Sequence, residues 1–315
     1  MTRSSVSQAL SGRPTGHDRL DVCVRSGAWL GFSAFAASLL GLTSFLVIKS
    51  APAWRAHGAE LVSGSMWHYP TESFGALAMT FGTISVTVCA LLLATPFAVA
   101  TATVVSEVMP GRLAALARTG LELLVGIPSV VFGLIGILFL VPAVRGIFGS
   151  PSGETLLTGS LLLAVMILPT VASLSESALR SVPLELRLAA RALGLTRAET
   201  TLQVLAASWR GQISAVLLGV GRALGETIAV FLVIGRADGR LPTSLADIPT
   251  SLLRAGQTLT TKLGGSEVAI AYGSTGTHEA ALIALAAILF AMVALVVVLG
   301  NRLRRRGLGM GEVVQ

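Results

Sequence analysis

Charged and aromatic side chains are scarce in this sequence. Of its 315 residues only 12% are charged and 5% aromatic, whereas 53% are hydrophobic, and the mean hydropathy is +0.79. Soluble domains usually contain about 25% charged residues. The low charge therefore excludes a cytosolic enzyme and a disordered regulator, and it predicts a membrane protein. Because spans in lipid must satisfy their own backbone hydrogen bonds, we expect an all-α fold.

Residues with special chemistry are also few. The two cysteines, Cys23 and Cys89, fall in a polar tail and in an apolar run, which excludes a disulfide scaffold. The four histidines are too dispersed in the sequence to predict a metal site. No G-x4-G-K-[ST] phosphate-binding loop occurs in the chain. We therefore expect no catalytic residue, no metal and no cofactor on this chain, and any ATP must be used by partner subunits.

Six apolar stretches approach or exceed the roughly 20 residues that a helix needs to cross a bilayer. They cover residues 27–48, 75–105, 121–141, 156–175, 212–235 and 279–301. The first is expected to be retained, because it is longer than the apolar core of a signal peptide. The sequence thus predicts a cytoplasmic tail (1–26), a first transmembrane helix (27–49), a five-helix transmembrane domain (74–301) and a cytoplasmic C-terminal tail (302–315).

Arginine supplies 21 of the 23 basic residues, and the formal net charge is +7. These residues lie in short polar segments between apolar runs, a distribution that orients membrane proteins and is not typical of a nucleic-acid-binding face. With the N-terminus inside, the cytoplasmic segments hold 15 basic residues and the outer loops 7, while Arg222 lies within a span. The positive-inside rule therefore predicts a multi-pass bacterial inner-membrane protein with both termini in the cytoplasm.

The loop over residues 176–210 is expected to form two short helices. Pro183 suits a first turn, and Gly194 is placed to end the first helix in a left-handed turn. Thr196 and Glu199 have the T-x-x-E spacing of a capping box that starts the second. Such an elbow is either a docking element for a cytoplasmic partner or an interfacial helix pair whose arginines snorkel.

The fifth span carries two opposite charges, Arg222 and Glu226. Their i, i+4 spacing predicts that they share one helical face. Each would cost about 3 kcal/mol at the bilayer centre, so neither is expected to face lipid. Three interpretations stay open: a structural ion pair, a snorkelling Arg222, and a substrate pathway. Gly219, Gly221 and Gly225 would let a neighbouring backbone approach closely.

The chemistry of the two side chains suggests a ligand for the pathway interpretation. A guanidinium offers planar, paired donors that fit two oxygens of a tetrahedral anion. Glu226 would repel a fully deprotonated anion but can accept a proton from hydrogen phosphate, and sulfate has no proton to offer. The pair therefore favours phosphate, unless Glu226 simply neutralises Arg222.

The cytoplasmic loop resembles the coupling loop of the membrane subunits of ABC importers, whose pattern is E-A-A-x3-G-x9-I-x-L-P. Here Ala189, Ala190 and Gly194 match that pattern. Leu188 stands at the Glu position, and Ala206-Ala207 replaces Leu-Pro. Loss of the carboxylate is expected to weaken contact with an ATPase, and loss of the proline to relax the exit from the second helix.

Residues 221–230, Gly-Arg-Ala-Leu-Gly-Glu-Thr-Ile-Ala-Val, resemble the signature of phosphate-specific ABC importer permeases of the PstC type, in the binding-protein-dependent transport inner-membrane component family. Residues 122–133, with their Gly-Ile-Pro-Ser-Val-Val stretch, resemble the family's third-span motif. The similarity covers residues 67–304. It implies a type I ABC importer permease bundle of six helices with cytoplasmic coupling helices.

The resemblance also assigns expected roles to residues. Those expected along the substrate pathway are Arg222, Glu226, Thr227, Pro128 and Ser129. Those expected in the ATPase-coupling loop are Ala189, Ala190, Arg191, Gly194, Thr196 and Glu199. Pro128 either leaves a carbonyl lining the path or only kinks a helix. Glu107 and Glu122 are expected to be structural and to pair with Arg112 or Arg118.

The leading hypothesis is thus a permease subunit of an ATP-driven, high-affinity inorganic phosphate importer that works by alternating access. The implied partners are a PstA-type permease, two cytoplasmic ATP-binding subunits and an extracytoplasmic phosphate-binding protein, which the outer loops 49–73 and 236–278 would receive. The alternatives are a permease for another oxyanion such as sulfate or phosphonate, and a sensing or scaffold subunit with weakened ATP coupling. A proton-coupled carrier is disfavoured, because the sequence has no six-span internal repeat.

Overall fold

The computed structural model of the protein describes residues 16–238, 241–271 and 277–306. The chain forms two units, Met1–Lys49 and Ser50–Gln315. The long helices are α2 (Gly16–His57), α4 (Leu77–Thr103), α8 (Leu156–Arg180), α11 (Trp209–Gly225) and α16 (His278–Arg306). The shorter helices are α3 (Glu60–Ser63), α5 (Gly111–Val125), α6 (Ser129–Ile135), α7 (Val141–Phe148), α9 (Leu184–Ala192), α10 (Arg197–Ala207), α12 (Ile228–Val233), α13 (Ile248–Leu252), α14 (Leu259–Leu263) and α15 (Glu267–Ala271).

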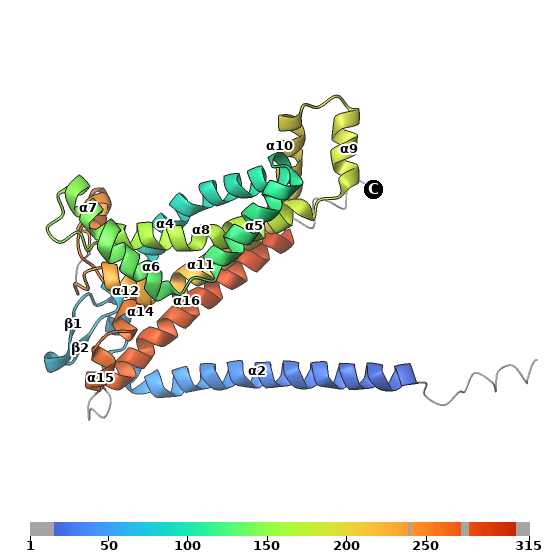
Figure 1. Ribbon diagram of the computed structural model, residues 1–315. Coiled ribbons are helices and arrows are strands. Elements are labelled where there is room, and N and C mark those ends of the chain that lie inside the picture. Colours follow the sequence, from blue (N-terminus) through green and yellow to red (C-terminus); the bar gives the residue numbers. More distant parts are fainter. Residues whose placement is uncertain (1–15, 239–240, 272–276, 307–315) are drawn as a thin grey trace, which may run out of the picture. The chain divides into compact units, whose positions relative to one another are not determined.

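In the second unit, α8 is the central helix, and α4, α5 and α11 lie alongside it, with α16 next to α11 (Figure 1). Alanines such as Ala90, Ala94 and Ala223 are buried where α4, α8 and α11 pack around Leu163 and Ile167. Small side chains let helices approach closely where lipid provides no hydrophobic drive for association. The elbow α9–α10 lies at one end of these helices, and α12, α14 and α15 lie at the other (Figure 1).

A short β-hairpin contacts the starts of α15 and α16. Strand β1 (Trp67–His68) pairs antiparallel with β2 (Ser73–Phe74), with Trp67 opposite Phe74. Between them Tyr69–Thr71 form a 3-10 turn. The Trp67 and Phe74 rings pack at 4.9 Å, and the Phe74 ring stacks on the His278 ring at 5.4 Å. The hairpin therefore fixes the start of α16.

Within the described residues, five helical segments are long and apolar enough to cross a membrane, or six if the bent pair α10 and α11 is one span. The prediction of an all-α membrane fold with about six spans is confirmed. Two predicted spans are not continuous, however. The stretch 121–141 breaks between α5 and α6, and the stretch 212–235 breaks between α11 and α12. Hydropathy did not indicate these breaks, because each is only a few residues long and lies between apolar runs.

Candidate functional site

Arg222 lies in the last turn of α11, just before the chain leaves the helix. The helix ends at Gly225, Glu226 is extended (φ −71°, ψ 125°), and α12 begins at Ile228. The prediction that Arg222 and Glu226 share one helical face is therefore wrong. The i, i+4 spacing brings side chains together only in a continuous helix, and this helix stops between the two residues.

The Arg222 guanidinium contacts a different helix. It is half-buried, and its Nη1 donates a hydrogen bond of 2.6 Å to the Thr170 hydroxyl in α8. In the described part of the chain, neither Arg222 nor Glu226 takes part in an ion pair. The interpretation as a self-neutralised pair thus has no support in these residues. A guanidinium has five donors, so Arg222 keeps donors with which it can bind an anion.

The Glu226 carboxylate is turned toward the start of α12. Its Oε1 accepts from the Ala229 backbone N–H at 3.3 Å, a favourable arrangement because a helix N-terminus attracts negative charge. The Glu226 carbonyl oxygen accepts from the Thr260 hydroxyl at 2.9 Å. Thr227 donates from its hydroxyl to the Gly225 carbonyl at 3.3 Å. These hydrogen bonds give the break a defined geometry, with a cationic side chain on one side and an anionic one on the other.

The interior of the chain offers little space at this break. A cavity of about 10 Å³ is lined by several threonines and by Glu226, together with apolar residues such as Leu163 and Val230. Such a volume holds about one water molecule. A tetrahedral oxyanion is larger, so an oxyanion that contacts Arg222 has to reach it from a surface of this chain. The break is therefore suited to line one side of a pathway.

Pro128 and Ser129 lie at the other break. Pro128 is the N-cap of α6, and Ser129 is its first residue, so the chain is interrupted there and not merely kinked. The half-helix α6 packs against α12 at Gly133, where a Cβ atom would lie only 3.1 Å from the Ala229 Cα. The half-helices that follow the two breaks thus pack together. The part that Pro128 and Ser129 play in a pathway stays a prediction.

The elbow over α9 and α10 has the predicted local structure. Gly194 adopts φ +82°, and the Gly194 and Leu195 N–H groups donate to the carbonyls of Arg191 and Ala190, the two hydrogen bonds of a Schellman motif. Thr196 and Glu199 form a capping box at the start of α10. Pro183 is the N-cap of α9, one position before the predicted first turn.

The elbow is fastened to the helices by an ion pair that the sequence did not indicate. Arg187 of α9 donates to Glu107 at 2.9 Å and to the Leu179 carbonyl at 2.9 Å. The prediction that Glu107 pairs with Arg112 or Arg118 is therefore wrong. Arg118 instead pairs with Glu176 of α8 at 2.7 Å.

Glu122 is exposed, and within the described ranges it forms no ion pair. Its predicted pairing with Arg112 or Arg118 is thus not found either. The positions of Glu107 and Glu176 on helix ends rich in apolar residues do signal that each needs a basic partner. Which arginine supplies it depends on contacts between segments far apart in the sequence.

The elbow exposes apolar side chains to its surroundings. Leu184, Leu188 and Leu193 are 62%, 54% and 80% exposed. Ala189, Arg191, Thr196 and Glu199 are exposed as well, whereas Ala190 is buried. Exposed leucines on a polar helix pair are typical of a surface that contacts a partner or a membrane, so the predicted docking role of the elbow stays a prediction. Leu188 thus presents an exposed apolar side chain where the family pattern has a carboxylate.

The exit from α10 is sharper than its sequence predicts. Although Ala206-Ala207 lacks a proline, α10 and α11 are bent by 63° relative to each other. The break is at Ser208, whose hydroxyl donates to the Leu205 carbonyl at 3.0 Å. A serine side chain that hydrogen-bonds to the backbone competes with the helical hydrogen bonds. Ser208 thus lies at the turn, near the position where the family pattern has a proline.

Residues 94–306 match the family described as "Binding-protein-dependent transport system inner membrane component". The chain is 33% identical over 297 residues to the phosphate transport system permease protein PstC of Mesorhizobium japonicum (strain LMG 29417 / CECT 9101 / MAFF 303099), covering 88% of this chain and 84% of that protein. It is 39% identical over 206 residues to the probable ABC transporter permease protein YqgH of Bacillus subtilis (strain 168), covering 63% of this chain and 66% of that protein, just under two thirds of its length.

A solved structure of the MetNI methionine ABC transporter in an inward-facing conformation matches the fold, with a TM-score of 0.52 and 18% identity over 72% of this chain and 93% of that one. The chain thus has the helical arrangement of a type I ABC importer permease. The family match covers most of the chain, and it identifies a transport component and not an ATPase. The protein belongs to the family of binding-protein-dependent transport system inner membrane components.

Proposed function

We propose that this chain is a permease subunit of an ATP-driven importer of inorganic phosphate and forms half of its translocation pathway. The observation that carries the proposal is the position of Arg222. Its guanidinium lies at a helix break inside the membrane domain and donates one hydrogen bond to Thr170. The remaining donors suit two oxygens of a tetrahedral anion. The similarity to phosphate transport permeases supports this choice of substrate.

A second subunit completes the pathway in this proposal. The cavity beside the break holds about 10 Å³ and cannot take up an oxyanion. Arg222 and Glu226 are both half-buried, so they can line a path that runs between this chain and a PstA-type permease. Glu226 favours an anion that carries a proton, because a carboxylate can accept from the P–OH group of hydrogen phosphate and repels sulfate.

In this proposal, the elbow transmits the movement of the ATP-binding subunits that drives alternating access. Two cytoplasmic ATP-binding subunits would dock on the exposed leucines of α9 and on the loop at Gly194. Their closure would move α9, and the Arg187–Glu107 pair would pass this movement to the end of the α4 span. An extracytoplasmic phosphate-binding protein would deliver the substrate at the opposite end. In this proposal ATP is used by the partner subunits, and this chain is expected to bind no cofactor.

The test is radiolabelled phosphate uptake into proteoliposomes that contain the co-purified complex, its ATPase subunits and the binding protein. We expect ATP-dependent uptake that a large excess of sulfate or phosphonate does not suppress. Uptake that sulfate or phosphonate suppresses would point to a permease for another oxyanion. An assembled complex that hydrolyses ATP without any uptake would instead indicate a sensing subunit.

A further inference from the structure

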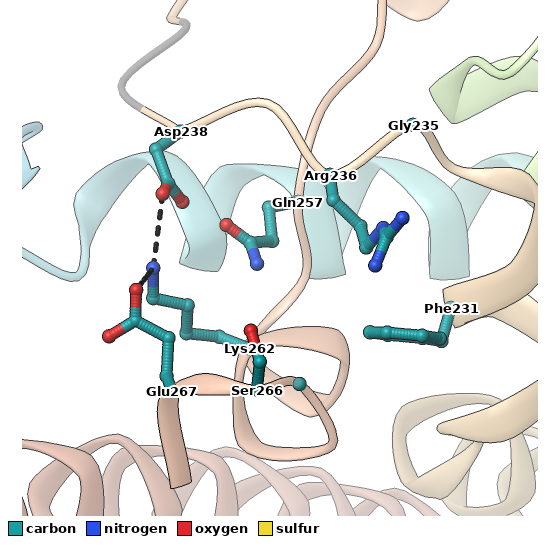
Figure 2. A pocket seen from close by; sticks show the side chains of 9 residues that line it. Phe231, Gly235, Arg236, Asp238, Gln257, Lys262, Ser266 and Glu267 are labelled. Atoms are coloured by element: carbon teal, nitrogen blue, oxygen red, sulfur yellow. Dashed lines mark hydrogen bonds and ion pairs between the residues drawn. The ribbon is translucent and has the colours of Figure 1, made fainter. Parts of the chain in front are cut away.

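A larger pocket, lined mainly by polar groups, lies at the end of the helices opposite the elbow. Its volume is about 290 Å³, and it is formed by the loop after α12 together with α14 and the start of α15. Figure 2 shows Lys262 with two carboxylates at one side of the pocket, Arg236 above Phe231 at the other, and Gln257 between them. This pocket and the small cavity at the break have no lining residue in common.

The lysine in this pocket is fully neutralised. Its side chain is 2% exposed, and its Nζ donates to Asp238 at 3.0 Å and to Glu267 at 2.9 Å. Glu267 also accepts from the Trp67 indole at 3.3 Å and from His278 at 2.8 Å. Burial raises the pKa of Glu267, but hydrogen bonding to Lys262, the Lys262 charge and the hydrogen bonds from His278 and Trp67 together lower it below its ordinary value. This side of the pocket is therefore an ion-pair cluster in which Lys262 and the two carboxylates bind one another.

The arginine on the other side is not neutralised. In the described part of the chain Arg236 forms no ion pair, and its guanidinium lies 4.7 Å from the centre of the Phe231 ring. Its backbone has φ +51°, a left-handed conformation that a non-glycine residue rarely adopts. Two neighbouring hydrogen bonds stabilise this conformation. The Gly256 N–H donates to the Ile234 carbonyl at 3.2 Å, and the Ala237 N–H donates to the Gly256 carbonyl at 3.3 Å.

Gln257 adds an unsatisfied polar group between the two sides. The residue is only 9% exposed, and its side-chain carbonyl oxygen is buried without a hydrogen-bond donor among the described residues. A buried acceptor without a partner is costly. An uncompensated cation beside an unfilled acceptor suits a ligand that carries both negative oxygens and a hydrogen-bond donor. Hydrogen phosphate has both, and sulfate has only the oxygens.

We infer that this pocket is an outer binding site for hydrogen phosphate, which the ion occupies before it reaches Arg222. Arg236 holds the unprotonated oxygens, and the hydroxyl of Ser266, which also lines the pocket, adds a donor. The P–OH group donates to the Gln257 amide oxygen or to Asp238. The inference rests on the proposed function, because it takes phosphate as the substrate and the end opposite the elbow as the outer one.

The direct test is binding of inorganic phosphate to the complex in the absence of the binding protein. The complex is purified in a maltoside detergent, which contains no phosphorus, and weak binding is followed by broadening of the ³¹P signal. Arg236→Asn is the main variant, since asparagine tolerates left-handed backbone. Arg145→Gln is the matched control, because Arg145 is an exposed arginine at the end of α7 outside the pocket. Phosphate binding by both is compared in an Arg222→Gln background, so that the remaining signal reports the outer site. Uptake by both is compared in the complex that retains Arg222.

We expect Arg236→Asn to weaken phosphate binding about tenfold, as loss of a charged hydrogen bond does. Gln257→Leu should weaken it as well, while Arg145→Gln leaves it unchanged. Sulfate should compete poorly. Phosphate binding equal to that of the Arg145→Gln control would overturn the inference. Unchanged phosphate binding combined with a higher requirement for the binding protein in uptake would show that the pocket docks an acidic side chain of that protein.

The outcome for this site is distinguishable from the outcome for the proposed function. If the parent complex takes up no phosphate with the binding protein and ATP present, the proposed function fails. If it takes up phosphate and Arg236→Asn matches the Arg145→Gln control in both uptake and binding, only the outer site fails.

Discussion

Arg187 and Glu107 lie 2.9 Å apart and join the elbow to the end of the α4 span. Their side chains are 19% and 11% exposed. Arg187 also donates to the carbonyls of Leu179 and Val182 at the end of α8, at 2.9 and 3.3 Å. A single guanidinium thus connects α9 to the ends of the α4 and α8 spans.

Removal of this connection should uncouple ATP hydrolysis from transport. In Arg187→Gln, Glu107 loses its charged partner, and we expect a local destabilisation of about 2 kcal/mol. The number of ATP molecules hydrolysed per phosphate imported should rise, and hydrogen exchange in α9 should accelerate. Arg112→Gln is the control, because Arg112 is exposed and makes no ion pair among the described residues. An unchanged ratio of ATP to phosphate would refute the connection.

Gly194 should be replaceable only by a residue that tolerates left-handed backbone. Its φ is +82°, and no atom lies within 4 Å of the position that a Cβ would take. The cost of substitution is therefore conformational and not steric, about 1–2 kcal/mol for an ordinary residue and less for asparagine. We expect Gly194→Val to lower ATP-dependent uptake severely in an assembled complex and Gly194→Asn to retain most of it. Equal uptake by the two variants would contradict this account.

The capping box should make the elbow sensitive to acid. The pKa of Glu199 is lowered from its ordinary 4.5 by hydrogen bonds from the backbone and the hydroxyl of Thr196. Because the pKa is lower in the folded state, the carboxylate stabilises α10 above pH 4.5 and loses this effect as pH falls through the lowered value. Hydrogen exchange at the start of α10 should accelerate over this range. In Glu199→Gln the acceleration should be absent, and its persistence would show that another group is responsible.

Local sequence patterns predicted the elbow well. The Thr196–Glu199 spacing and the position of Gly194 specify their hydrogen bonds within a few residues, so no distant segment is needed to form them. The contacts of Arg187, Arg118 and Arg222 could not be predicted in this way, because their partners lie 80, 58 and 52 residues away.

The break at Glu226 was hidden for a different reason. It contains no proline, and the apolar runs before Gly225 and after Thr227 keep the mean hydropathy of the stretch high. The hydrogen bond from Thr260 in α14 to the Glu226 carbonyl helps to hold the chain out of the helix there. A tertiary contact thus overrides a local preference for helix, and it moves Glu226 away from the face on which Arg222 lies.

We expect Arg236 to contribute to phosphate binding and to lower the stability of the folded chain. Its φ of +51° is unfavourable for a side chain other than glycine, and relief of such strain is worth about 1 kcal/mol or more. We expect Arg236→Gly to raise the thermal unfolding temperature of the purified complex while it weakens phosphate binding. If Arg236→Gly lowers the unfolding temperature, the guanidinium stacked on Phe231 contributes more to stability than its backbone costs.

The central claim is that Arg222 contacts phosphate during transport. Its most direct test is ATP-dependent phosphate uptake by Arg222→Ala in proteoliposomes, with assembly of the complex and ATP hydrolysis measured alongside. The account predicts that the variant assembles and hydrolyses ATP but imports almost no phosphate. Uptake near the level of the parent complex would show that Arg222 serves only to bind Thr170 and that the pathway lies elsewhere.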